Sequence, residues 1–396
     1  MLLVGVDMKY KAKKTIISLT SYPNRIETVH KVIESLFGQT EKVDEIILWL
    51  SKIEFPKRGR ELPQMLKCLI GKNGFRIEWV EENLKSHKKY FYALQEDNNI
   101  VITVDDDMIY ANTMVKTLMD SYRLHPNAIS ARNVHMIFKK NNAQASYKEW
   151  EYYVSEYSGM ERMDMCAIGV NGILYPPGCA NKQWFDLEGI ESYAENQDDL
   201  WLKYHEIIDK IPIVYTGMGE RDVLIEGTQN MALYIKNHDG RNNDICWSKL
   251  MSLMKRNHAT IYYEWNESLI EKEDFIQQKR RYYYSKLKNL FIEDKDIYIG
   301  GAGKYAHILY QFIKSCGKAN YIKAFLVTVK EKTKDIIDIK TIQELNANKA
   351  FTVICGVGKR YREELKRELD IYELCEWVDV DLNEIMRLLS LEIKCE

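Results

Sequence analysis

The sequence has no apolar run near the ~20 residues that a membrane-spanning helix needs. Its N-terminal apolar stretch, MLLVGV, is too short for a signal peptide, so we expect a cytoplasmic protein. The eight cysteines show no C-x-x-C spacing and no nearby histidine pattern. This argues against a zinc site or a disulfide framework and favours thiols that serve in packing.

An excess of charge of either sign is also missing. The 56 basic and 58 acidic residues give a net charge of -2, which provides no general attraction to nucleic acid. Ligands must therefore be sought at local sites. The 396 residues, 46% of them hydrophobic, are enough for two domains with ordinary globular cores.

Strand-like and helix-like segments alternate over the first 110 residues, which predicts βαβ units and a mixed, mostly parallel sheet. Strands are predicted at 13–20, 43–51, 75–80 and 101–104, and helices at 29–37, 87–95 and from 113 to 124. From 127 to 250 the pattern loosens into short strands and glycine-rich turns. Irregular segments laid over a regular scaffold commonly carry specificity, so we place the acceptor site there.

Residues 251–292 are rich in charge and aromatic rings and predict a helical linker, with a helix lying on an anionic membrane face as the alternative. Strand–turn–helix units then restart, which predicts a small Rossmann-like α/β domain at 293–396 after a first domain at 1–250. Gly301, Gly303 and Ala306 fit the G-x-G-x-x-A pattern. The next strand, AFLVT, ends without the acidic residue that a ribose needs, which disfavours NAD. Another nucleotide, a sugar, or a structural or homo-oligomerising role stays open.

Three consecutive aspartates, Asp105, Asp106 and Asp107, follow the strand at 101–104. Carboxylates crowded in this way repel one another unless solvent or a cation neutralises them, and a hard divalent ion with oxygen ligands suits them. Ligands of open α/β sheets bind beyond the carboxyl ends of strands, which is where these residues are expected. The alternative is an acidic turn whose aspartates cap the following helix.

Five segments taken in order resemble the bacterial GT-A glycosyltransferases, of family-2 type, that build capsular and other surface polysaccharides. They are SLTSYPNRI, HKKYFYALQ, ITVDDDMIY, GVNGILYPPG and QDDLWLK, and the resemblance covers residues 14–250. It implies a GT-A nucleotide-sugar transferase domain that needs Mn²⁺ or Mg²⁺. The implied partners are a nucleotide-sugar donor and an oligosaccharide or lipid-linked glycan acceptor, which leaves open peripheral contact with the inner face of the cell membrane.

The acidic run matches the D-x-D motif of these enzymes, with Asp105 and Asp107 on either side of Asp106. The resemblance implies that Asp107 binds the metal ion and that Asp105 reaches the ribose or the ion. A metal suits this chemistry because a departing nucleoside diphosphate builds up negative charge. His238 is a candidate for completing the metal shell, with an exposed loop histidine as the alternative.

The turn after the first strand is expected to contact the donor nucleotide. Hydroxyls of Thr20 and Ser21 can meet the base or ribose, the Tyr22 ring can stack, and Arg25 can form charge-assisted bonds to phosphate. Lys88 is a candidate for the diphosphate, and Asn171 with Gly172 for the donor sugar, although a tight turn explains the latter pair as well. Buried packing is the default interpretation of the nearby aromatic residues Tyr175, Trp184 and Trp201, with a sugar-stacking platform as the alternative.

Asp198 and Asp199 open a predicted helix, where one carboxylate is explained as a cap of the backbone N–H groups. The other is then available as the general base that takes the acceptor's proton in an inverting transfer. The sequence does not separate the two. The usual Glu-Asp pair of the family is Asp-Asp here.

Two other functions stay open at this stage. Nucleotidyl transfer to a sugar phosphate also uses a metal on an α/β sheet, but it usually needs a glycine-rich loop after the first strand, and SLTSYPNR has no glycine. A non-catalytic scaffold that binds nucleotide-sugars is the second alternative. The acids at Asp107 and at the Asp198–Asp199 pair argue against it.

Overall fold

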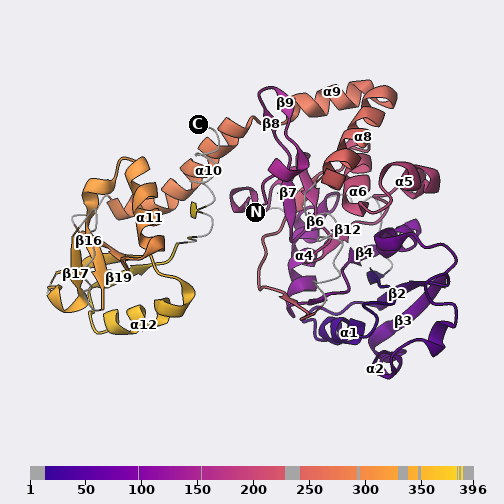
Figure 1. Ribbon diagram of the computed structural model, residues 1–396, viewed down its shortest axis with the longest axis horizontal. Coiled ribbons are helices and arrows are strands. Elements are labelled where there is room, and N and C mark those ends of the chain that lie inside the picture. Colours follow the sequence, from indigo (N-terminus) through magenta and orange to yellow (C-terminus); the bar gives the residue numbers. More distant parts are fainter. Residues whose placement is uncertain are drawn as a thin grey trace, which may run out of the picture. The chain divides into compact units, whose positions relative to one another are not determined.

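The computed structural model describes residues 14–96, 98–152, 154–227, 241–291, 295–328, 338–346, 349–380, 382 and 385–386 (Figure 1). The chain divides into two compact units, at 1–270 and 271–396. Within the described ranges, no helix is long and apolar enough to cross a membrane.

The first unit is built on an eight-stranded sheet with the order β10-β13-β6-β12-β4-β1-β2-β3. Strands β3, β2, β1 and β4 run parallel, while β12 lies antiparallel between β4 and β6. The predicted mixed, mostly parallel sheet is thus confirmed. The strands are β1 Thr15–Thr20, β2 Glu45–Ser51, β3 Phe75–Val80, β4 Ile100–Thr103, β6 Ile129–Ala131, β10 Glu161–Arg162, β12 Ile173–Tyr175 and β13 Ile213–Tyr215.

Helices cover the sheet with the faces that their sequences predict. In α1 (Val29–Phe37) the residues Val29, Val32, Ile33 and Leu36 repeat at helical spacing and are buried. The other elements of this unit are α2 Gln64–Lys67, α3 Lys88–Phe91, α4 Met114–Leu124, α5 Leu187–Tyr193, α6 Asp198–Ile208, β5 Met108–Ile109, β7 Val134–Met136, β8 Lys139–Lys140, β9 Ala143–Gln144, β11 Met165–Ala167 and β14 Val223–Leu224.

The helix predicted at 87–95 is wrong in its extent. Its α-helical part, α3, covers only Lys88–Phe91 and is flanked by 3₁₀ turns at Lys85–His87 and Ala93–Gln95. All four residues of α3 are buried, so the segment has no solvent face to support regular amphipathic helix geometry. Ser18 Oγ donates to the Lys89 carbonyl at 2.5 Å and holds the segment against β1.

The predicted linker at 251–292 is divided between the two units. Helices α8 (Arg241–Asn257) and α9 (Ala259–Ser268) belong to the first unit, and α10 (Lys272–Leu287) belongs to the second. Tryptophans explain the division: the Trp247 ring lies 5.1 Å from that of Trp150 and 6.0 Å from that of Trp265. Burial of these rings fixes α8 and α9 to the first unit.

The second unit holds a five-stranded parallel sheet with the order β17-β16-β15-β18-β19, as in a Rossmann-like half. Its glycines serve packing: a Cβ at Gly301 would lie 2.4 Å from Val357, and one at Gly356 would lie 2.7 Å from the Gly300 carbonyl oxygen. The elements are β15 Asp296–Gly300, α11 Lys304–Ser315, β16 Ile322–Val327, β17 Ile339–Thr341, β18 Phe351–Cys355, α12 Lys359–Leu369 and β19 Cys375–Val378.

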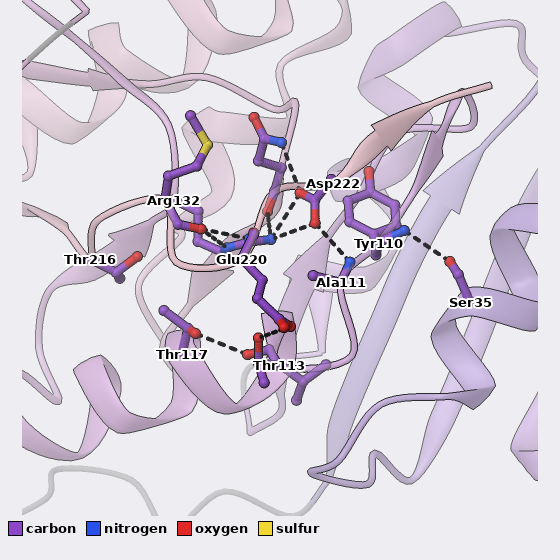
Figure 2. A network of polar contacts seen from close by, with 12 residues as sticks. Ser35, Tyr110, Ala111, Thr113, Thr117, Arg132, Thr216, Glu220 and Asp222 are labelled. Carbon is purple, nitrogen blue, oxygen red and sulfur yellow. Dashed lines mark hydrogen bonds and ion pairs between the residues drawn. The ribbon is translucent and has the colours of Figure 1, made fainter. Parts of the chain in front are cut away.

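A buried ion pair ties a late segment of the first unit to the chain directly after β6 (Figure 2). Arg132 Nη1 lies 2.9 Å from Asp222 Oδ2, and both side chains are fully buried. The guanidinium also donates to the carbonyls of Met218 and Glu220, while Asp222 accepts from the Ala111 N–H at 2.8 Å. Beside it, β14 pairs with β5. Arg132 and Asp222 thus form a clamp, which anchors the chain directly behind the three aspartates.

We predict that Arg132→Met destabilises the first unit by about 3–5 kcal/mol, because Asp222 is left charged and buried without its partner. Urea denaturation of the variant and the wild type measures the difference. Lys116→Met is the control, since Lys116 pairs with the exposed Asp120 and should cost less than about 1 kcal/mol. Equal stabilities of Arg132→Met and the wild type would contradict the stabilising role of the Arg132–Asp222 ion pair.

Candidate active site

Carboxylates and basic side chains from four separate segments meet at the carboxyl edge of the parallel strands. Asp105, Asp106 and Asp107 follow β4, and the turn that contains Arg25 follows β1. The N-terminus of α6 brings Asp198 and Asp199, and α3 brings Lys89. The ion pairs described below join these segments, so the residues predicted from the acidic run, the first turn and the Asp-Asp pair lie together.

Arg25 and Ser21 hold the middle of the acidic run. Arg25 Nη1 lies 2.7 Å from Asp106 Oδ1 and 3.1 Å from Asp107 Oδ2, and Ser21 Oγ donates to Asp106 Oδ2 at 2.5 Å. Both oxygens of Asp106 are therefore engaged within the protein, whereas Asp107 shares the Arg25 guanidinium with Asp106. The Arg25 guanidinium also lies 5.7 Å from the centre of the Tyr22 ring. Thr20 points into the sheet, where its hydroxyl donates to the Trp49 carbonyl at 2.9 Å.

Lys89 links the acidic run to α6. Its buried ammonium lies 2.9 Å from Asp105 Oδ1 and 2.9 Å from Asp198 Oδ2. Burial opposes its charge, but the two carboxylates outweigh this and raise the pKa of Lys89 well above its usual value. The sequence-based candidate was its neighbour Lys88, which instead lies 2.7 Å from Glu54 Oε2 and donates to Asn83. Spacing does not define the direction of a side chain in so short a helix.

Gly169 provides the space in which these groups meet. A Cβ at this position would lie 2.5 Å from Lys89 Nζ and 3.5 Å from Asp105 Oδ1. The Gly169 N–H donates to the Asp199 carboxylate, at 3.2 Å from Oδ1 and 3.3 Å from Oδ2. A larger residue would push the lysine out of its ion pairs, so the glycine is needed for space.

Asn171 and Gly172 form a tight turn with φ of +79° and +98°. The side-chain amide of Asn171 donates to Asp222 at 2.8 Å, and the backbone carbonyl of Asn171 accepts from Arg132. These contacts place Asn171 in the clamp behind the site and support the turn interpretation. The rings of Tyr175, Trp184 and Trp201 are buried in the protein interior, as the default interpretation held.

The two aspartates of α6 differ in electrostatics. Burial opposes ionisation of Asp198, but Lys89 outweighs it, so the pKa of Asp198 is lowered. Burial, together with the charge on Asp198, raises the pKa of Asp199 to about 8. Asp199 is also the less buried of the two residues. The structure thus separates a locked carboxylate from one that holds a proton near neutral pH.

The site carries more acid than base, which suits a divalent cation. Five carboxyl groups, Asp105, Asp106, Asp107, Asp198 and Asp199, share two basic groups, Arg25 and Lys89. Burial and the neighbouring Asp105 raise the pKa of Asp107 to about 6, as expected for a carboxylate short of positive charge.

The side chains of Asp105 and Asp107 are 30% and 12% exposed, so their hard oxygen atoms are accessible and fit Mn²⁺ or Mg²⁺. In the described part of the chain no group of three or more His, Cys, Asp or Glu residues is arranged to hold a metal. An ion at this pair would therefore draw further ligands from phosphate and water. His238 lies outside the described residues.

Comparison with known proteins gives similarity in backbone path only. No protein-family model matches the sequence, and no curated protein matches it by sequence. The chain is similar to S. aureus TarS 1-349 in complex with UDP-GlcNAc (TM-score 0.39, 12% identity, covering 78% of this chain and 84% of that chain). It is also similar to mannosyltransferase PcManGT from Pyrobaculum calidifontis in complex with GDP-Man and Mn²⁺ (TM-score 0.32, 13% identity, covering 53% and 56%). These scores are low, so the likeness assigns neither a family nor an activity to this chain.

We predict opposite effects of the two α6 substitutions on stability. Between about pH 4 and pH 8 the folded chain keeps a proton on Asp199 that the unfolded chain releases, so wild-type stability falls as the pH rises through this window. Asp199→Asn lacks this loss and should be more stable than the wild type at pH 8 by about 1–3 kcal/mol, with little difference near pH 4.

Asp198→Asn is the matched variant on the same helix. It removes a partner of the buried Lys89 and should be less stable than the wild type at pH 8. Thermal unfolding from pH 4 to pH 8 measures both variants. A stability difference between Asp199→Asn and the wild type that does not change with pH would exclude the raised pKa.

Proposed function

We propose that the first unit is a metal-dependent glycosyltransferase that moves a sugar from a nucleotide-sugar to a hydroxyl of a surface-glycan acceptor. The observation that carries the proposal is the convergence of the D-x-D aspartates, the Arg25 turn and the two α6 carboxylates at one sheet edge. Ligands of such sheets bind at this edge, and the sequence resemblance to GT-A enzymes supports a donor site there.

The donor's diphosphate belongs beside Asp107 and Arg25. Arg25 is partly buried between two carboxylates and supplies a fixed, permanently charged donor group. Asp107 and Asp105 would hold Mn²⁺ or Mg²⁺, which when bound supplies a Lewis acid that offsets the charge of the leaving diphosphate. The hydroxyl of Ser21 keeps Asp106 in place, so that the guanidinium stays oriented.

Asp199 is the better candidate for the general base. Asp198 is committed to Lys89, whereas the Asp199 carboxylate accepts from the Gly169 backbone N–H and keeps a pKa of about 8. A general base works best when its pKa lies near the working pH, because part of the population is then deprotonated and still binds the proton of the attacking hydroxyl strongly. Attack on the anomeric carbon from the side opposite the diphosphate inverts its configuration, and we expect the product to show this.

Activity should depend on the metal and on both aspartates. We expect purified protein, given Mn²⁺ and a panel of nucleotide-sugars with sugar acceptors, to hydrolyse or transfer one donor, and chelation to abolish this. Asp107→Asn should lose about 100-fold or more in kcat/KM, and Asp199→Asn about 100-fold to 10,000-fold in transfer. Nucleotide release measured by a coupled assay, with NMR of the product anomer, tests each point.

Lys116→Gln, on the exposed face of α4, serves as the control and should retain wild-type rates. Full activity of Asp107→Asn would remove the metal assignment. Donor binding without turnover across all acceptors would instead favour a sugar-binding scaffold.

A further inference from the structure

Helices α5 and α8 of the first unit are in contact, and both are labelled in Figure 1. A cleft of about 410 Å³ is lined by residues of these two helices. Its walls are Ser192 and Tyr193 from α5, and Ser248, Lys249, Ser252 and Arg256 from α8. On α8 the residues Ser248, Ser252 and Arg256 repeat every four positions and so form one stripe of the helix. The cleft is separate from the acidic site and takes no part in the chemistry described above.

The lining is basic and rich in hydroxyl groups. Among the described residues that line the cleft there is no carboxylate. Neither Lys249 nor Arg256 forms an ion pair or a hydrogen bond with any described residue, whereas their neighbour Lys255 lies over the rings of Tyr262 and Tyr263. Two exposed cations without a partner among the described residues, beside serine and tyrosine hydroxyls, form an arrangement that suits an anion carried by a hydroxyl-rich molecule.

The cleft lies close along the chain to the proposed base. Tyr193 precedes Asp198 by five residues, so their Cα atoms are at most about 18 Å apart. The intervening segment is anchored near the acidic site, because His87 Nε2 lies 2.8 Å from the Ala194 carbonyl oxygen and His87 adjoins α3. A molecule in the cleft is thus within reach of the α6 N-terminus.

We propose that this cleft binds an anionic group, phosphate or carboxylate, carried by the glycan acceptor. The inference rests on the proposed transferase function and names its acceptor class: a sugar chain with a negative charge near the hydroxyl that is glycosylated. The acidic site and the cleft differ in charge and therefore favour different parts of the acceptor. The acidic site, without its metal, repels such a group, while Lys249 and Arg256 attract it to the other end of the acceptor.

The test measures binding before any chemistry. Full-length protein without donor or metal is titrated calorimetrically with a hexose phosphate, a hexuronate, the uncharged hexose, inorganic phosphate and vesicles of anionic lipid. We expect the charged sugars to bind, and the double variant Lys249→Gln with Arg256→Gln to weaken this by about ten-fold or more. Lys255→Gln removes the same charge from the same helix and should bind like the wild type.

Because the calorimetric titration needs no turnover, it tests anion binding in the cleft independently of the proposed transferase activity. Where transfer is measured, the double variant should raise the KM for charged acceptors and leave donor hydrolysis unchanged. Equal binding of charged and uncharged hexoses overturns the proposal. So does inorganic phosphate binding as tightly as the sugar phosphate, an equal loss in Lys255→Gln, or binding to lipid vesicles alone.

Discussion

The candidate site depends on one buried lysine. Lys89 contributes a single positive charge to two carboxylates that arrive from different parts of the fold, Asp105 after β4 and Asp198 at the start of α6. Without it, the buried Asp198 and the partly buried Asp105 would repel each other at the sheet edge, and burial makes such repulsion costly. The lysine also commits Asp198, and this leaves Asp199 as the carboxylate with a raised pKa.

Hydrogen bonds to the neighbouring strands keep Lys89 in place. Its carbonyl accepts from Ser18 Oγ, which in turn accepts from the Trp49 indole, so the backbone of α3 is bonded to both β1 and β2. Gly169 leaves the space for the ammonium. Positioning therefore comes from the sheet, and the acidic groups of the site are held by rigid elements, as precise chemistry requires.

Much of the architecture could be predicted from the sequence because buried parallel strands appear as short β-branched runs, and the acidic run stands directly after one of them. The contribution of Lys89 could not, since two adjacent lysines in a four-residue helix give no periodicity to choose between them. The Arg132–Asp222 pair was missed for another reason: its residues are far apart in sequence, and no local pattern marks a buried ion pair. The attachment of α8 and α9 depends on Trp150, Trp247 and Trp265, whose mutual contacts are tertiary.

The clamp behind the aspartates has a consequence for biosynthesis. The Ile225 N–H donates to the Asp107 carbonyl, and Asp222 fixes Ala111, so the backbone of the acidic run is completed by chain made more than a hundred residues later. Contacts of such long sequence separation form slowly and only after loop closure. On the ribosome, the backbone of the acidic run therefore lacks these two contacts until residue 225 has emerged from the exit tunnel, although Arg25 and Lys89, which pair with the aspartates, are made early.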